Sequence, residues 1–132
     1  MSNRLLVIDD ASIHRMILCK LAEKTGFSAT GAASFDEAAR LLRESDFDCI
    51  TLDLSLGERA GVEVLRLLSE LGSRVPVIVI SGSEAAVLDE TVRIGKSMGL
   101  EIRSAISKPV DLSVFRDELM KVGVQKLARA PA

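Results

Sequence analysis

Five polar residues, far apart in the chain, each follow a short apolar stretch and suit metal or phosphate chemistry. They are Asp9, Asp10, Asp53, Ser81 and Lys108. Three carboxylates held close together repel one another unless a cation joins them, and Mg²⁺ favours carboxylates, a backbone carbonyl and retained waters. A lysine supplies a compact positive charge, a hydroxyl donates to phosphoryl oxygens, and a carboxylate can form an acyl phosphate. Brought together, these groups would suit a divalent cation and phosphoryl transfer.

Each of these residues also has an ordinary structural explanation when it is taken alone. Asp9 and Asp10 could cap the following helix, and Asp53 could cap a turn. Ser81, within the sequence SGS, is a turn signal, and Lys108 is a solvated lysine before a helix. The prediction of a site therefore depends on their joint spacing, because each motif follows a separate predicted strand.

Apolar periodicity predicts five strands that alternate with five helices. Strands are expected at residues 4–8, 28–32, 48–53, 75–80 and 101–106. Helices are expected at residues 12–25, 34–45, 62–71, 84–98 and from about 111 to 127. Ser34 and Glu37 form a capping box, and Gly26, Gly72 and Gly99 each follow a helix.

This alternation predicts an α/β fold with a parallel sheet and helices on both faces. The stretch VPVIVI at 75–80 is continuously apolar, as expected of a strand covered on both sides. In such sheets ligands bind beyond the carboxyl ends of the strands. All the candidate residues are predicted to lie at that edge.

Length and composition favour one globular domain that binds neither nucleic acid nor membrane. The chain has 132 residues, which we divide into a domain at 1–127 and a tail or linker stub at 128–132. Its net charge is −2, its basic residues are scattered, and it has no Trp or Tyr for base stacking. No apolar run approaches the roughly 20 residues that span a bilayer, and we expect no signal peptide.

The two cysteines are expected to be buried thiols. Cys19 and Cys49 have no second cysteine or histidine at metal-binding spacing. This favours a reducing compartment and hence a cytoplasmic location, with a disulfide or a redox switch as the alternative.

Four segments together resemble the receiver domain of two-component response regulators, over nearly the whole chain. The segments are VIDDASIHR for the acidic pair, LDLSLGERAG for the phosphoacceptor, VIVISG for the switch strand and ISKPV for the lysine–proline motif. Gly61 lies eight residues past Asp53, as that family has it. The resemblance implies a doubly wound, flavodoxin-like parallel sheet of five strands in the order 2-1-3-4-5.

The resemblance also implies a magnesium site. Asp10, Asp53 and the backbone carbonyl of Ser55 would bind Mg²⁺, and Asp9 would assist through water. The cation would be the only cofactor.

A phosphoryl site is implied beside the metal. Asp53 would accept a phosphoryl group from the phosphohistidine of a sensor histidine kinase or a phosphotransfer protein. Ser81 would hold a phosphoryl oxygen, and Lys108 would bridge the phosphoryl group and the acidic pair. The peptide bond from Lys108 to Pro109 would be cis.

The chain departs from the family pattern in three places. Ala105 stands where an aromatic residue usually lies, so signalling should act through Ser81 and the loop 82–86. Leu56 and Gly57 replace a usual Met-Pro pair. The predicted helix after the fourth strand and the approach to the fifth strand look long. This run, ISGSEAAVLDETVRIGKSMGLEI, is similar, more weakly, to receivers joined to cyclic-di-GMP phosphodiesterase domains.

His14, the only histidine, lies one turn past the acidic pair in the first predicted helix. Ile13 and Ile17 are expected to face inward, which would turn His14 outward. We therefore expect a solvated surface residue, with a kinase-docking contact as the alternative and no catalytic role.

These features favour a signalling module over a turnover enzyme, with two alternatives. A receiver-fold adaptor would act through protein contacts without phosphate. An aspartyl-nucleophile phosphatase would need a second aspartate two residues beyond Asp53, where this chain has Ser55. The partners would be a kinase and a downstream protein or a fused output domain. The last two helices could form a homodimer face, unless Val87, Leu88 and Phe115 belong to the core.

Overall fold

The computed structural model describes residues 3–54, 61–82 and 85–129, and the side chains of these residues up to 123. Within them five parallel strands form one sheet in the order β2-β1-β3-β4-β5. The strands are β1 (Asn3–Ile8), β2 (Phe27–Ala32), β3 (Cys49–Asp53), β4 (Val77–Ser81) and β5 (Ile102–Ser107). The helices are α1 (Ser12–Lys24), α2 (Phe35–Glu44), α3 (Gly61–Glu70), α4 (Ala85–Ser97) and α5 (Leu112–Arg129).

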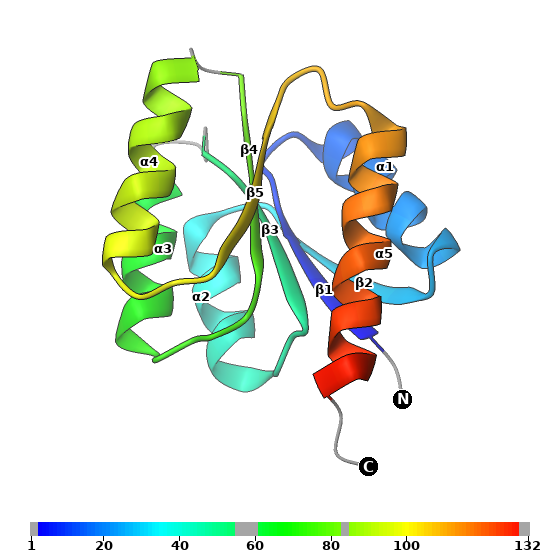
Figure 1. The fold of residues 1–132 in the computed structure, drawn as a ribbon, viewed down its shortest axis with the longest axis horizontal. Coiled ribbons are helices and arrows are strands. Elements are labelled where there is room, and N and C mark those ends of the chain that lie inside the picture. The colour runs from blue at the N-terminus through cyan, green and yellow to red at the C-terminus, as the bar shows by residue number, and fades with distance from the viewer. Residues whose placement is uncertain (1–2, 55–60, 83–84, 130–132) are drawn as a thin grey trace.

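The helices cover both faces of the sheet, as the alternation of elements predicts. Figure 1 shows α1 and α5 on one face and α2, α3 and α4 on the other. This confirms the doubly wound fold and the strand order. None of the described helices is long and apolar enough to cross a membrane.

The local signals for helix ends are confirmed with one change. Ser34 accepts a hydrogen bond from the Glu37 backbone N–H at 3.2 Å, as the capping box predicts. The Glu37 carboxylate accepts from the N–H of Ala33, at 2.8 Å, one residue earlier than the usual capping-box partner. Gly26 follows α1 with φ of +92°, a conformation that favours glycine.

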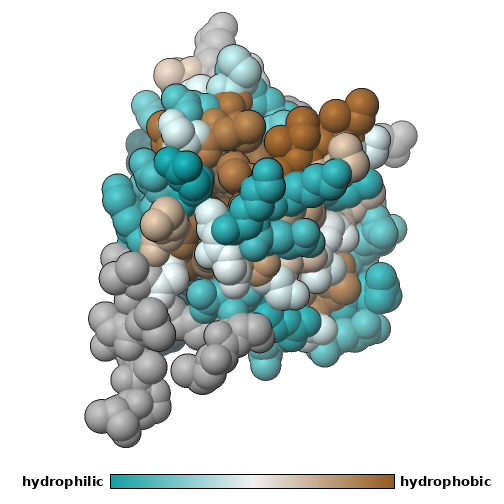
Figure 2. Space-filling view, turned by 90° about the vertical axis from the view of Figure 1, so that its right-hand side faces the viewer, coloured by the Kyte–Doolittle hydropathy of each residue, from teal (hydrophilic) through white to brown (hydrophobic). Residues whose placement is uncertain are grey.

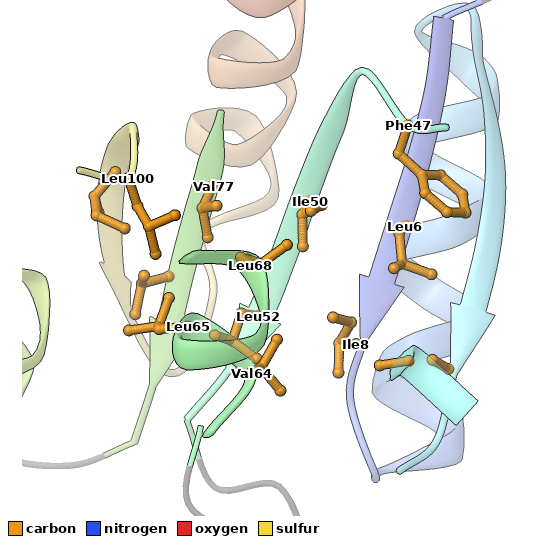
Figure 3. Close-up of a cluster of buried hydrophobic side chains, with 14 of the residues drawn as sticks. Leu6, Ile8, Phe47, Ile50, Leu52, Val64, Leu65, Leu68, Val77 and Leu100 are labelled. Carbon is orange, nitrogen blue, oxygen red and sulfur yellow. The ribbon is translucent and has the colours of Figure 1, made fainter. Parts of the chain in front are cut away.

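Strand β4 shows how the sheet divides the core into two layers. Successive side chains of a strand point to opposite faces. Val77 and Val79 pack with the cluster under α2, α3 and α4, from which hydrophobic side chains are drawn in Figure 3. Ile78 and Ile80 pack with the cluster under α1 and α5. All four side chains are buried, so the continuous apolar run serves both layers.

The predicted orientation of α1 is wrong. Ile13 and Ile17 are 69% and 39% exposed, whereas Leu18 and Ala22 are fully buried. Positions 14, 18 and 22 share one side of a helix, so His14 lies on the buried side. Apolar residues form two candidate stripes on this helix, and the one that contains Leu18 and Ala22 faces the sheet.

The remaining expectations about apolar residues are partly confirmed. Leu88 and Phe115 belong to the core, at 5% and 0% exposure, whereas Val87 is 51% exposed. Cys49 is buried as predicted, but Cys19 is only half-buried. Both cysteines are free thiols.

Candidate functional site

Backbone hydrogen bonds bring the predicted site residues to one edge of the sheet. Asp9 follows β1, Asp53 ends β3, Ser81 ends β4 and Lys108 follows β5. The Asp9 N–H donates to the Ala32 carbonyl at 3.0 Å, and the Lys108 N–H donates to the Ser81 carbonyl at 2.9 Å. This edge is the upper end of the sheet in Figure 1, opposite the end where β1 begins.

The centre of this edge is an ion pair between the phosphoacceptor candidate and the lysine. The Asp53 carboxylate is 1% exposed, and its Oδ2 lies 2.5 Å from Lys108 Nζ. The lysine side chain is 30% exposed, so it reaches the carboxylate from the surface. A buried carboxylate is costly without a partner, and Lys108 supplies the balancing charge. The Lys108–Pro109 peptide bond is cis, as the resemblance implies.

Asp9 is held in place at three points. Its Oδ1 accepts from the Ala11 N–H at 2.9 Å, and its Oδ2 contacts His14 Nδ1. Its backbone carbonyl accepts from Arg15 Nη1 at 2.8 Å. The Arg15 side chain lies against Gly31 on β2, where a Cβ would come within 2.9 Å of Arg15 Cδ. A glycine at that position therefore lets the arginine cross the strand and reach Asp9.

The predicted outward orientation of His14 is wrong. Its side chain is 24% exposed and pairs with Asp9. One ligand atom each of Asp9, His14 and Asp53 lie within 4.8 Å of one another. A signal for this was present in the sequence, because His14, Leu18 and Ala22 are spaced four residues apart.

The other predicted site residues either do not belong to the cluster of Asp9, His14 and Asp53 or lie outside the described residues. Ser81 is fully buried at the edge. Asp10 is exposed and is not among the three clustered residues. Ser55 and the loop residues Leu56 and Gly57 lie outside the described residues. The metal roles of Asp10 and Ser55 stay predictions.

Neither thiol has the properties of a nucleophile. Burial raises the pKa of Cys49 to about 12, and burial also raises the pKa of Cys19. Both residues therefore stay protonated at neutral pH, whereas a reactive cysteine needs a lowered pKa.

An acidic cluster at the carboxyl edge of a doubly wound parallel sheet defines a flavodoxin-like α/β protein with a site suited to a cation. The chain belongs to the response regulator receiver domain family, whose model matches residues 5–120. The resemblance seen in the motifs is thereby confirmed for nearly the whole chain. The protein is a receiver domain of two-component signalling, a class whose members are typically not true enzymes. The cluster of Asp9 and Asp53 is consistent with a receiver metal site.

Known proteins of this family are similar over almost the full chain. The sensory/regulatory protein RpfC of Xanthomonas campestris is 31% identical over 127 residues, covering 93% of this chain. The chain spans only 17% of the length of RpfC. The chemotaxis protein CheY of Thermotoga maritima is 29% identical over 125 residues, covering 92% of this chain and 98% of CheY.

Solved structures show the same fold. A response regulator from Colwellia psychrerythraea has a TM-score of 0.84 and 25% identity, covering 95% of this chain and 99% of that one. A response regulator from Burkholderia pseudomallei, solved with a phosphorylated aspartic acid, a calcium ion and citrate, has a TM-score of 0.75 and 24% identity. The alignment covers 99% of this chain and 76% of that one.

Proposed function

We propose that the protein is a phosphoacceptor module, in which Asp53 accepts a phosphoryl group from the phosphohistidine of a partner kinase. The observation that carries this proposal is the buried Asp53 carboxylate with Lys108 Nζ at 2.5 Å. The Burkholderia structure, with its phosphorylated aspartic acid, supports the same chemistry on this fold.

The transfer needs one bond to form and one to break. A carboxylate oxygen of Asp53 attacks phosphorus as the bond to the kinase imidazole nitrogen breaks, and the imidazole keeps the electron pair. Lys108 neutralises charge on the transferred oxygens, and Ser81 donates its hydroxyl to one of them. Positioning and charge neutralisation supply most of the catalysis in such transfers.

The residues at this edge fit a divalent cation. Asp9 and Asp53 are both 1% exposed and place carboxylate oxygens close together, and such oxygens are the ligands that Mg²⁺ prefers. We propose Asp10, Asp53 and the Ser55 carbonyl as ligands, with Asp9 assisting through water. When bound, the cation neutralises the negative charge that gathers around the transferred group.

One feature of the sequence supports a module that holds the phosphoryl group over a phosphatase with turnover. Ser55 stands two residues beyond Asp53, where an aspartyl-nucleophile phosphatase needs a second aspartate. Self-phosphorylation and slow hydrolysis remain its only proposed activities. Ala105 is exposed on β5 and carries no ring, so we propose that signalling acts through Ser81 and the loop 82–86.

We further propose a kinase or phosphotransfer protein as the partner at α1. Figure 2 shows apolar side chains gathered near the top of the face that α1 and α5 form. The exposed apolar residues of α1 are Ile13, Met16 and Ile17. A downstream protein or a fused output domain, either of them in the cytoplasm, would receive the signal, and a homodimer through α4 and α5 stays a prediction.

The test is phosphorylation by acetyl phosphate with Mg²⁺, followed by mass spectrometry. We expect a mass gain of one phosphate that Asp53→Asn abolishes. Asp48→Asn is the matched control, because Asp48 accepts a hydrogen bond from the Arg4 backbone N–H at the opposite end of the sheet. No gain in the unaltered protein would overturn the proposal in favour of an adaptor. Steady phosphate release from a phosphomonoester would favour the phosphatase.

A further inference from the structure

A nitrogen donor lies among the carboxylates at the edge of the sheet. We propose that His14 supplies an imidazole ligand to the cation held there, so that the site favours first-row transition ions over Mg²⁺. This inference depends on the cation site of the proposed function and concerns which ion that site selects.

The rotation of α1 directs this imidazole into the site. His14 is on the same side of the helix as the fully buried Leu18 and Ala22, and its own side chain is 24% exposed. Its Nδ1 contacts Asp9 Oδ2, so the ring lies against a carboxylate that is itself 1% exposed. The His14 side chain therefore contacts the site and is also accessible to solvent. An ion needs such access to enter the site.

A transition ion held by His14 would also take Asp9 as a direct ligand, in place of the water-mediated contact that we propose for Mg²⁺, and the spacing of the three ligand atoms suits such an ion after a small adjustment. The atoms from Asp9, His14 and Asp53 lie within 4.8 Å of one another. Ligands at about 2.1 Å from one ion are at most about 4.2 Å apart. A closure of about half an ångström is enough, because the partly exposed imidazole can shift toward the ion.

The donor set determines which ion is favoured. Mg²⁺ prefers oxygen ligands and octahedral geometry, so an imidazole adds little to its binding. Imidazole suits later first-row ions, and affinity for a mixed nitrogen and oxygen site rises from Mn²⁺ to Ni²⁺. His14 therefore raises the affinity for Ni²⁺, Co²⁺ or Zn²⁺ relative to Mg²⁺.

A purely structural role for His14 makes a different prediction. If Nδ1 only donates a hydrogen bond that positions Asp9, its loss weakens every cation by a similar factor. Glutamine in its place, which also donates a hydrogen bond, would then restore the binding of every cation.

The first test compares the affinities of Mg²⁺ and Ni²⁺ by calorimetry on the full chain. Loss of an outer-shell partner that orients a metal ligand already costs about 10- to 100-fold in affinity, and loss of a direct ligand should cost no less. We expect His14→Leu and His14→Gln to weaken Ni²⁺ by about tenfold or more and to leave Mg²⁺ nearly unchanged. Equal losses for the two ions, or full rescue by His14→Gln, would overturn the proposal. Cys19→Ser is the control against Ni²⁺ binding at the half-buried thiol, and it should keep the Ni²⁺ affinity.

The second test detects the nitrogen directly. Bound Mn²⁺ should show, by pulsed electron paramagnetic resonance, the coupling of a directly bonded imidazole nitrogen, and His14→Gln should remove it. His14 is the only histidine, so the signal has one possible source in the chain. Bound Mn²⁺ without nitrogen coupling would overturn this inference while leaving the proposed function intact. If the nitrogen coupling is present but acetyl phosphate fails to label the protein, the inference about His14 stands and the proposed phosphoacceptor function is overturned.

Discussion

At the amino end of the sheet the buried residues are apolar, whereas at its carboxyl end two buried carboxylates and a hydroxyl take their place. Strand β3 shows the contrast within five residues, because it begins with Cys49 and ends with Asp53. Both side chains are at most 1% exposed. Polar groups near the amino end make their contacts closer to the surface. One example is the Arg4 guanidinium, which lies over the Phe47 ring at 5.2 Å from its centre.

This difference teaches that stability and function come from separate ends of one sheet. Burying carboxylates costs free energy that apolar side chains would not. Proteins keep such groups where activity needs them and gain their stability elsewhere. Variants at the amino end should therefore change the free energy of unfolding without changing the chemistry, and variants at the carboxyl end should change the chemistry.

The largest loss of stability is expected from Phe47→Ala at the amino end. Phe47 is 7% exposed and packs in the core layer under α2 and α3. Removing a buried ring should lower the free energy of unfolding by about 3–5 kcal/mol. Urea unfolding followed by circular dichroism measures this, with Phe47→Leu as a milder control. Phosphorylation of the folded fraction should be unchanged, and a fall in phosphorylation without a loss of stability would break the comparison.

The next effect is expected from Lys108→Ala at the carboxyl end. The variant leaves the Asp53 charge buried without its lysine, which should cost about 1–3 kcal/mol in the absence of metal. Mg²⁺ binding should be intact or tighter, because a repelling cation is gone, while the response to phosphorylation is impaired. Calorimetry and urea unfolding measure both effects. Markedly weaker Mg²⁺ binding would contradict the proposed role of Lys108.

The double variant Asp53→Asn with Lys108→Ala sharpens that result. Neutralising the carboxylate removes the charge that the lysine balances, so most of the cost in stability should disappear. If the losses in unfolding free energy of the two single variants simply add in the double variant, the lysine stabilises the fold by packing alone.

An effect that is absent at neutral pH and confined to alkaline pH is expected from Cys49. Its pKa rises in the folded protein from an ordinary value of 9.0 to about 12, because burial disfavours the thiolate. Between these values the unfolded chain releases the proton and the folded chain keeps it. The free energy of unfolding should therefore fall by up to about 1.4 kcal/mol per pH unit, with no contribution below pH 9. The free energy of unfolding of Cys49→Ala, measured in urea, should decline less steeply as the pH rises above 9. An equally steep decline in the variant and in the unaltered protein would contradict the assignment of this effect to Cys49.

The smallest effect is expected from Asp111→Ala, an exposed charge at the start of α5. Its Oδ1 accepts from the Ser113 hydroxyl and backbone N–H, at 2.7 and 2.9 Å. The hydrogen bond from the Ser113 side chain is the main cause of its lowered pKa. A lowered pKa stabilises the fold above the ordinary value of 3.8, and this contribution is lost as the pH falls through the folded value.

Thermal unfolding near neutral pH should show a small loss for Asp111→Ala. The difference from the unaltered protein should vanish at acidic pH. Asp111→Asn keeps the acceptor oxygen and serves as the control. A difference that persists at acidic pH would mean that the charge is irrelevant.

The strands and their ends could be predicted because the relevant signals are local. The run of Val and Ile in β4 requires cover on both faces, and the acidic and lysine motifs directly follow apolar strands. The rotation of α1 could not be predicted in the same way. It agrees with the contacts that His14 makes with Asp9 and that Arg15 makes beside Gly31, and these join residues from different elements. Periodicity within one helix shows where a stripe is possible, and only tertiary contacts select one.

The exposed Ala105 on β5 offers a practical benefit for spectroscopy. The chain contains no tryptophan and no tyrosine, so its native ultraviolet fluorescence is almost silent. A single tryptophan introduced at this position would be the only indole in the molecule. Its emission wavelength would report the polarity beside β5 as the protein binds a cation or is phosphorylated, and no other indole would contribute background.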